Sequence, residues 1–118
     1  MSSSASEVAV EIRDMIAVVR LMRPAKRNAL SDALMAEIDA AFAALPKSVG
    51  CAVLTGSGDH FSAGLDLSEI RERDAVEGLH HSRSWHRILG NLEFGRIPIV
   101  AALHGAVVGG GLELASSC

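Results

Sequence analysis

Apolar residues alternate with small or charged residues along residues 8–12 (VAVEI). A repeat of two is typical of a β-strand with one face toward solvent. Residues 16–21 (IAVVRL) are almost continuously apolar and β-branched, which predicts a second strand that is buried on both faces. Because only a short turn at Arg13 and Asp14 separates the two segments, we expect them to form a β-hairpin.

The repeat changes to helical spacing after Ser31, a residue type that often caps a helix N-terminus. Apolar side chains then recur every three or four positions as far as Leu45, and Pro46 ends the pattern. A second helix is predicted over residues 77–94, on an apolar stripe formed by Trp85, Ile88, Leu89 and Leu92. Between these helices, the charged stretch 67–74 is compatible with a short helical turn.

Short apolar runs at residues 51–55 and 99–103 predict two further buried strands. A glycine-rich segment then leads into a helix that opens at Gly110, and no residue typical of a helix ending follows before Cys118. We therefore expect the chain to end inside a helix. The resulting order, β-β-α-β-α-β-α, favours the α/β class with parallel strand pairings.

The composition describes a globular chain of 118 residues, 49% of them hydrophobic. Taken alone, this length predicts one complete small domain. The 14 acidic residues outnumber the 11 basic ones, and the net charge of −3 offers no basic surface for nucleic acid or for an anionic membrane. Residues 97–115 are long enough to span a bilayer, but the carboxylate of Glu113 would be too costly there, so no membrane helix is expected.

Cysteine and histidine usage predicts no metal site. Cys51 and Cys118 lack the spacing of metal ligands, and we interpret them as reduced thiols. No pair of histidines has zinc-binding spacing on a helix together with a carboxylate to complete the ligands. The first residues lack the charged and apolar regions of a secretory signal, so we expect a flexible N-terminus over residues 1–7, a single domain over 8–118 and a cytoplasmic location.

The glycines before the last helix invite comparison with phosphate-binding loops. Gly105 and Gly110 have the spacing of a G-x-x-x-x-G-K-S/T loop, but Gly111 and Leu112 stand where the lysine and the hydroxyl residue are needed. A G-x-G-x-x-G fingerprint that begins at Gly109 would need a sixth residue that is glycine, and leucine stands there. A nucleotide site is therefore not predicted.

What remains is a glycine-rich helix start with one carboxylate, Glu113, three residues after Gly110. Unpaired N–H groups at a helix start favour an oxyanion, and a glycine lets a ligand approach the backbone closely. Glu113 shares a helix face with Gly110, where it either complements the helix dipole or serves as an acid/base group. Its apolar neighbours predict a partly desolvated carboxylate. The small residues at 62–64 (SAG) could supply a second N–H donor to the same oxyanion.

Three segments, residues 23–30 (RPAKRNAL), 61–67 (FSAGLDL) and 104–115 (HGAVVGGGLELA), resemble the successive signatures of the crotonase, or enoyl-CoA hydratase/isomerase, superfamily. They occur in the family's order and with ordinary spacing. The resemblance runs from residue 8 to residue 118, about the first half of a typical member. It implies an α/β fold built as a crotonase-like spiral of ββα turns, incomplete at the C-terminus.

The resemblance also implies an acyl-CoA thioester ligand, with coenzyme A as part of the substrate rather than a cofactor. By motif position, the N–H groups of Ala63 and Gly110 would form the oxyanion hole for the thioester oxygen, and Glu113 would be the first of two catalytic glutamates. The remaining residues that match thioester-binding segments of the family are Lys26, Arg27, Ala29, Ser62, Gly64, Asp66 and Leu67.

The reaction that the resemblance favours is hydration of a 2-enoyl-CoA by a hydro-lyase, and the resemblance implies a homotrimer or a dimer of trimers. The second glutamate of a hydratase would lie beyond Cys118, so two alternatives stay open: double-bond isomerisation, and a CoA-thioester-binding role without turnover. For the same reason we expect residues 1–118 alone to be inactive.

Overall fold

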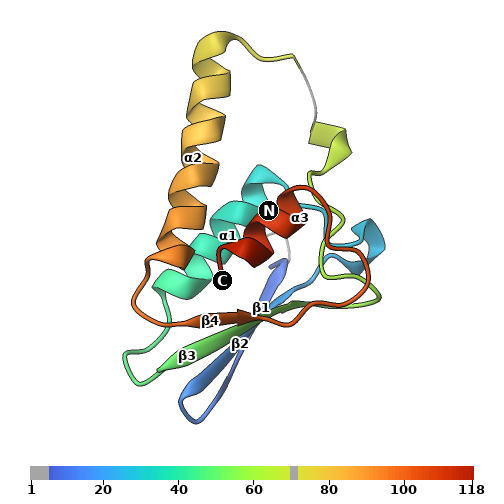
Figure 1. Cartoon of the computed structure of the whole chain (residues 1–118). Coiled ribbons are helices and arrows are strands. Elements are labelled where there is room, and N and C mark those ends of the chain that lie inside the picture. Colours follow the sequence, from blue (N-terminus) through green and yellow to red (C-terminus); the bar gives the residue numbers. More distant parts are fainter. Residues whose placement is uncertain (1–5, 70–71) are drawn as a thin grey trace, which may run out of the picture.

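The strands form one mixed sheet, and the helices lie on one side of it (Figure 1). This description comes from a computed structural model that describes residues 6–69 and 72–118. The strands, in their order across the sheet, are β1 (Val8–Arg13), β2 (Ile16–Leu21), β3 (Cys51–Gly56) and β4 (Ile99–Ala101). β1 and β2 pair antiparallel, whereas β2 with β3 and β3 with β4 pair in parallel. The predicted hairpin and the α/β class with parallel pairings are confirmed.

Side-chain caps determine where the two longer helices begin. The helices are α1 (Asp32–Ala43), α2 (Ala75–Glu93) and α3 (Gly110–Ser116). Ser31 caps α1 as predicted, since its side chain accepts a hydrogen bond from the Leu34 N–H at 3.0 Å. α2 begins at residue 75 rather than 77 because Asp74 caps it and accepts from the Glu77 N–H at 2.8 Å. The predicted apolar stripe missed this cap because Asp74 lies outside the apolar repeat.

The apolar stripes of the helices meet the sheet in one core. Leu54 of β3 is fully buried there together with Leu34 and Ile38 of α1, Leu92 of α2 is 3% exposed, and Leu114 of α3 is fully buried. Burying one such side chain contributes about 1.5–3 kcal/mol relative to leaving it exposed. Each helix therefore contributes its own apolar residues to the core that it shares with the sheet, which also fixes the position of its N-terminus.

After β2, β3 and β4 the chain makes a second, shorter extended passage before it enters a helix. Leu30, which follows β2, forms a parallel bridge with Leu65, which follows β3. Ser62 forms a parallel bridge with Val107, which follows β4. Each turn of the chain thus contributes a strand, a short extended segment and a helix, in agreement with the ββα spiral that the resemblance implies. Because the strands are parallel, the three short segments meet at one end of the sheet.

Two strand predictions are wrong in part. β2 is fully buried on one face only, because the helices cover one side of the sheet (Figure 1). β4 ends at Ala101 rather than at residue 103, and Val100 in its middle is 62% exposed. The physical reason is that β4 is an edge strand: in the described residues no further strand pairs with it.

The flexible N-terminus predicted over residues 1–7 is described by the structure only at Ser6 and Glu7. The Ser6 hydroxyl and the Glu7 N–H both donate to the carboxylate of Glu37, so these two residues are tied to α1. The turn expected within residues 67–74 is confirmed as a 3-10 turn at Leu67–Glu69, and residues 70–71 lie outside the described residues. In the part of the chain that the structure describes, no helix is long and apolar enough to cross a membrane.

Candidate active site

The loop after β2 contains the cations Lys26 and Arg27, and the side chain of Asn28 holds this loop in place. The Asn28 side chain is fully buried; its Oδ1 accepts from the Arg23 N–H at 2.9 Å and its Nδ2 donates to the carbonyls of Ser57 (2.9 Å) and His60 (2.7 Å). Asn28 has φ of 53°, in the left-handed region, which asparagine tolerates better than most residues. The buried amide thus anchors this loop to the loop after β3.

Lys26 ends the 3-10 turn Pro24–Lys26, and Arg27 follows it with φ of 52°. Both side chains are exposed, and among the described residues neither forms an ion pair. Ala29 is half-buried; its N–H donates to the Lys26 carbonyl at 3.0 Å, and its own carbonyl accepts from Arg23 Nη1 at 2.6 Å. The loop therefore directs two positive charges to the surface while its backbone is held internally.

The Ser62 side chain is engaged inside the protein, and the substrate contact predicted for Ser62 stays a prediction. Ser62 is fully buried, its hydroxyl donates to the Asn28 carbonyl at 2.8 Å, and the same oxygen accepts from the Gly64 N–H at 3.2 Å. A hydroxyl engaged in both directions inside the protein holds the segment in place rather than facing a ligand.

Asp66 is likewise engaged internally. Its Oδ2 pairs with Arg23 Nη2 at 3.0 Å, and its Oδ1 accepts from the N–H and the hydroxyl of Ser68 at 3.0 and 2.7 Å. The hydrogen bonds from Ser68 and from Arg23 lower the pKa of the Asp66 carboxyl from its ordinary 3.8 to about 2. With a side chain only 9% exposed, Asp66 stabilises this segment and does not line an open pocket. Leu67, by contrast, is 76% exposed.

Glycines allow the start of α3 to pack directly against the 61–66 segment. A Cβ on Gly111 would lie 2.6 Å from the Ser62 carbonyl oxygen, a distance that no real side chain adopts. Gly64 has φ of +100°, and a Cβ there would lie 2.7 Å from the Val108 carbonyl oxygen and 3.6 Å from Gly110 N. These two glycines are required for close approach, which brings the first N–H groups of α3 beside residues 64 and 65.

Two backbone N–H groups near this contact have no acceptor among the described residues: those of Gly110 and Leu65. Gly110 is the first residue of α3, where a helix leaves its N–H unpaired. Leu30 exchanges its hydrogen bonds with the residues on either side of Leu65, donating to the Gly64 carbonyl and accepting from the Asp66 N–H. The Leu65 N–H is therefore directed away from Leu30, as in any parallel bridge. A Cβ built on Gly110 would lie 3.8 Å from Leu65 N, which places the two donors side by side.

The prediction that Ala63 supplies an oxyanion donor is wrong. The Ala63 N–H donates to the Arg27 carbonyl at 2.9 Å, so it holds the cationic loop instead. Leu65 has the unpaired N–H, and sequence reasoning missed it because its contribution comes from the backbone and depends on the bridge to Leu30. No feature of the local sequence reports that pairing. Arg23 was missed as well, since its partners Glu7 and Asp66 lie far from it along the chain.

Glu113 lies one helical turn beyond Gly110, and its side chain is exposed. The predicted partial desolvation of this carboxylate is wrong for the described residues, because Glu113 is exposed, and neighbouring Leu112 is itself 54% exposed. Glu113 lines a cavity of about 190 Å³ together with residues of α2: His81, Ser82, Trp85, His86 and Leu89. Helix α2 thus forms the opposite wall of the space that Glu113 faces.

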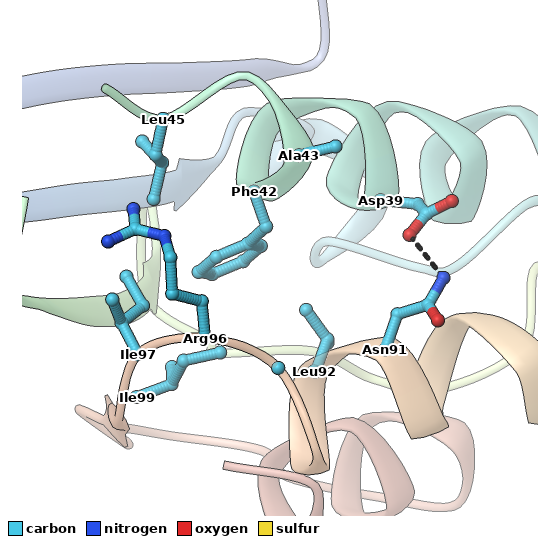
Figure 2. Close-up of a pocket in the computed structure, with 10 residues that line it drawn as sticks. Asp39, Phe42, Ala43, Leu45, Asn91, Leu92, Arg96, Ile97 and Ile99 are labelled. Atoms are coloured by element: carbon cyan, nitrogen blue, oxygen red, sulfur yellow. Dashed lines mark hydrogen bonds between the residues drawn. The ribbon is translucent and has the colours of Figure 1, made fainter. Parts of the chain in front are cut away.

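A larger cavity of about 320 Å³ lies elsewhere, between the C-terminal ends of α1 and α2 (Figure 2). The polar side chains that line it are already paired: Asp39 accepts from Asn91 Nδ2 at 3.1 Å, and Arg96 donates to the carbonyls of Val49 and Pro46. It contains none of the residues that the sequence motifs single out. Glu113 lines the smaller cavity, and Trp85, which lines it too, would lie 3.5 Å from a Cβ on Gly110. The smaller cavity, with the two N–H groups beside it, is therefore the candidate active site.

Comparison with protein families agrees with the three motifs. A family model described as enoyl-CoA hydratase/isomerase matches residues 11–118. Among curated proteins, the chain is 39% identical to 4-chlorobenzoyl coenzyme A dehalogenase-1 from Arthrobacter sp, over 99% of this chain and 45% of that protein. It is 34% identical to the short-chain-enoyl-CoA hydratase of Clostridium acetobutylicum, over 96% of this chain and 44% of that protein.

Solved structures give the same result for the fold. A protein of Rhodopseudomonas palustris CGA009 assigned to the enoyl-CoA hydratases superposes with a TM-score of 0.92 at 48% identity, over 100% of this chain and 46% of that one. The enoyl-CoA hydratase of Thermoplasma volcanium GSS1 superposes with a TM-score of 0.89 at 30% identity, over 97% of this chain and 46% of that one. The chain thus spans a little under half the length of these relatives.

Proposed function

The chain belongs to the enoyl-CoA hydratase/isomerase family, and from this premise we propose that the natural full-length protein hydrates a 2-enoyl-CoA thioester. The observation that carries the proposal is that the unpaired Gly110 and Leu65 N–H groups lie close to each other and to Trp85, which lines the same cavity as Glu113. Two backbone donors and one carboxylate are the groups that thioester enolate chemistry needs.

The two N–H groups would act on the thioester oxygen. When water adds at C3 of a 2-enoyl thioester, the electron pair of the double bond moves toward C1 and negative charge develops on that oxygen. Donors already fixed by Leu30 and by the start of α3 need no reorganisation to stabilise this charge. Losing one such donor typically lowers kcat by about 10²- to 10³-fold.

Glu113 would act as the general acid–base group. The oxygen of water bonds to C3, one of its protons leaves to a base, and a proton is delivered to C2 so that the thioester is restored. General acid–base help of this kind contributes about 10²- to 10⁴-fold. Glu113 lines the cavity one helical turn from Gly110, so it is the described carboxylate placed for this role.

Lys26 and Arg27 would bind the phosphates of coenzyme A. Their exposed charges lie on the loop whose Arg27 carbonyl accepts from the Ala63 N–H, two residues before Leu65 in the sequence. A ligand with its thioester at Gly110 could therefore extend its phosphates toward this loop. We propose the cytoplasm as the compartment and a homotrimer, or a dimer of trimers, as the assembly.

A second candidate is chemistry on a halogenated aroyl-CoA. It is favoured by the aromatic wall of the small cavity, to which Trp85, His81 and His86 contribute, and by the 39% identity to the Arthrobacter dehalogenase. An indole and two imidazoles pack well against a flat ring. The same N–H pair would then polarise the carbonyl of the aroyl thioester.

The test is turnover by the purified full-length protein with crotonyl-CoA and, separately, with 4-chlorobenzoyl-CoA. Water addition to the first substrate that is lost in Glu113→Gln supports hydration; chloride release from the second supports the second candidate. Glu93→Gln, an exposed carboxylate at the end of α2, is the matched control and should keep full activity. Tight binding of both thioesters without turnover of either would contradict both and favour the non-catalytic alternative.

A further inference from the structure

Asp32, at the first turn of α1, contacts two rings of α2 with a single carboxylate. Its Oδ1 accepts a hydrogen bond from Trp85 Nε1 at 2.7 Å and lies 3.0 Å from His81 Nδ1. The two rings also contact each other, with centroids 5.3 Å apart at 42°. Arg73 Nη2 lies 3.7 Å from the other carboxylate oxygen. Asp32 therefore joins the start of α1 to the aromatic part of α2.

These rings border the candidate site. His81 and Trp85 line the cavity of about 190 Å³ that Glu113 also lines. Trp85 Cζ3 would lie 3.5 Å from a Cβ on Gly110, and that Cβ would lie 3.8 Å from Leu65 N. The edge of the indole thus reaches van der Waals distance of the space between the two N–H donors. Trp85 is therefore within contact distance of an acyl group whose carbonyl oxygen sits there.

We propose that Asp32 is a positioning residue for the acyl group: it fixes the indole of Trp85 as the wall that limits acyl size beside Glu113. The inference rests on the proposed acyl-CoA function. An indole has a single donor, and Asp32 is its acceptor, so this bond is the polar constraint on the ring orientation. Without it the ring can turn, and the cavity admits bulkier acyl groups.

The chain offers a matched control on the same helix pair. Asp39, two turns further along α1, accepts from Asn91 Nδ2 at 3.1 Å and from Arg87 Nη1 at 3.4 Å on α2. Asp39 and Asn91 line the other cavity (Figure 2), whose lining includes neither Gly110 nor Glu113. Asp39→Ala therefore removes an equivalent polar link between α1 and α2 without touching the candidate site.

The experiment measures kcat and KM of the full-length protein for crotonyl-CoA, with a four-carbon acyl group, and for cinnamoyl-CoA, with a phenyl ring. Asp32→Ala should raise the ratio of kcat/KM for cinnamoyl-CoA over crotonyl-CoA about tenfold, the size expected for one wall contact in an apolar pocket. Trp85→Phe breaks the same hydrogen bond from the other side and should change the ratio in the same direction. Asp32→Asn keeps an oxygen acceptor and should restore most of the wild-type ratio.

The outcomes separate the inference from its premise. A ratio in Asp32→Ala that stays within about twofold of wild type, as expected for the distant Asp39→Ala control, overturns the positioning role while leaving the proposed function standing. A loss of activity that is equal for both substrates in Asp32→Ala also overturns it, since that is the result of a merely structural role. If wild type binds neither thioester, the proposed function fails and the inference fails with it. If Asp32→Ala does not fold, the substrate ratio of Trp85→Phe tests the positioning role instead.

Discussion

Replacing Gly110 by alanine separates folding from catalysis at the proposed oxyanion site. A Cβ at this position would lie 3.5 Å from Leu30 Cδ1 and from Trp85 Cζ3, which is ordinary van der Waals contact. The backbone there is helical rather than left-handed, so alanine is not strained. Alanine in place of glycine at a position with a compatible backbone adds about 0.4–1 kcal/mol of stability, because it restricts the unfolded chain. The variant is therefore expected to unfold at the same temperature as wild type or a few degrees higher.

Turnover should respond in the opposite direction. The new methyl group would lie 3.8 Å from Leu65 N, in the space that an oxygen bound to both N–H groups must enter. Displacing the oxygen from one donor costs about 2.7–4 kcal/mol in the transition state, a loss of about 10²- to 10³-fold in kcat. KM should change less than kcat, because the donors act on charge that develops only as water adds.

The assay follows thermal unfolding and steady-state hydration of crotonyl-CoA in the same protein preparation. Gly90→Ala is the matched control: Gly90 lies within α2, a Cβ there meets nothing within 4 Å, and the change should stabilise the helix without reducing turnover. A folded Gly110→Ala variant with the kcat of Gly90→Ala would refute the assignment of Gly110 to the oxyanion site.

Four further outcomes are expected. Glu113→Gln should lower kcat at least about 10²-fold while leaving the unfolding temperature unchanged, since the side chain is exposed; thermal melts and turnover check this together. Asp66 has a folded-state pKa of about 2, below its ordinary value of 3.8, so its contribution to stability is fully present above about pH 4 and is lost as pH falls through 2. Urea unfolding along an acid series should show this loss in wild type and a smaller one in Asp66→Asn. Gly64→Ala should destabilise by more than about 1 kcal/mol, because φ is +100° and the Cβ would lie 2.7 Å from a carbonyl oxygen; chemical unfolding gives the value. Ser31→Ala should cost about 1 kcal/mol through loss of the α1 cap, measured the same way.

Periodicity and caps predict most of the elements because both are local. Ser31 and the apolar repeat after it locate α1, and the run at residues 51–55 locates β3 within one residue of its end. The errors in predicted burial occur where the neighbouring elements, rather than the local sequence, determine whether a side chain is exposed. Val100 is as apolar as a buried strand residue, yet it is exposed because no described strand lies beyond β4.

The sequence predicts the first N–H donor of the candidate site, at Gly110, but it does not identify the second donor. Gly110 follows from the glycine-rich helix start, because helix N-termini always leave N–H groups unpaired. The second donor does not, since whether Ala63 or Leu65 has an unpaired N–H depends on the partners Arg27 and Leu30 across the spiral. Ser62 and Asp66 were predicted to contact ligand, but their partners Asn28 and Arg23, over 30 residues away, turn them inward.

The most direct test of the central claim is a crystal structure of the full-length protein with a bound acyl-CoA, in which the distances from the thioester oxygen to the backbone nitrogens are measured. We predict that this oxygen lies about 2.7–3.1 Å from both Gly110 N and Leu65 N, with the acyl group beside Trp85 and Glu113. A thioester oxygen bound away from these two N–H groups would contradict the account.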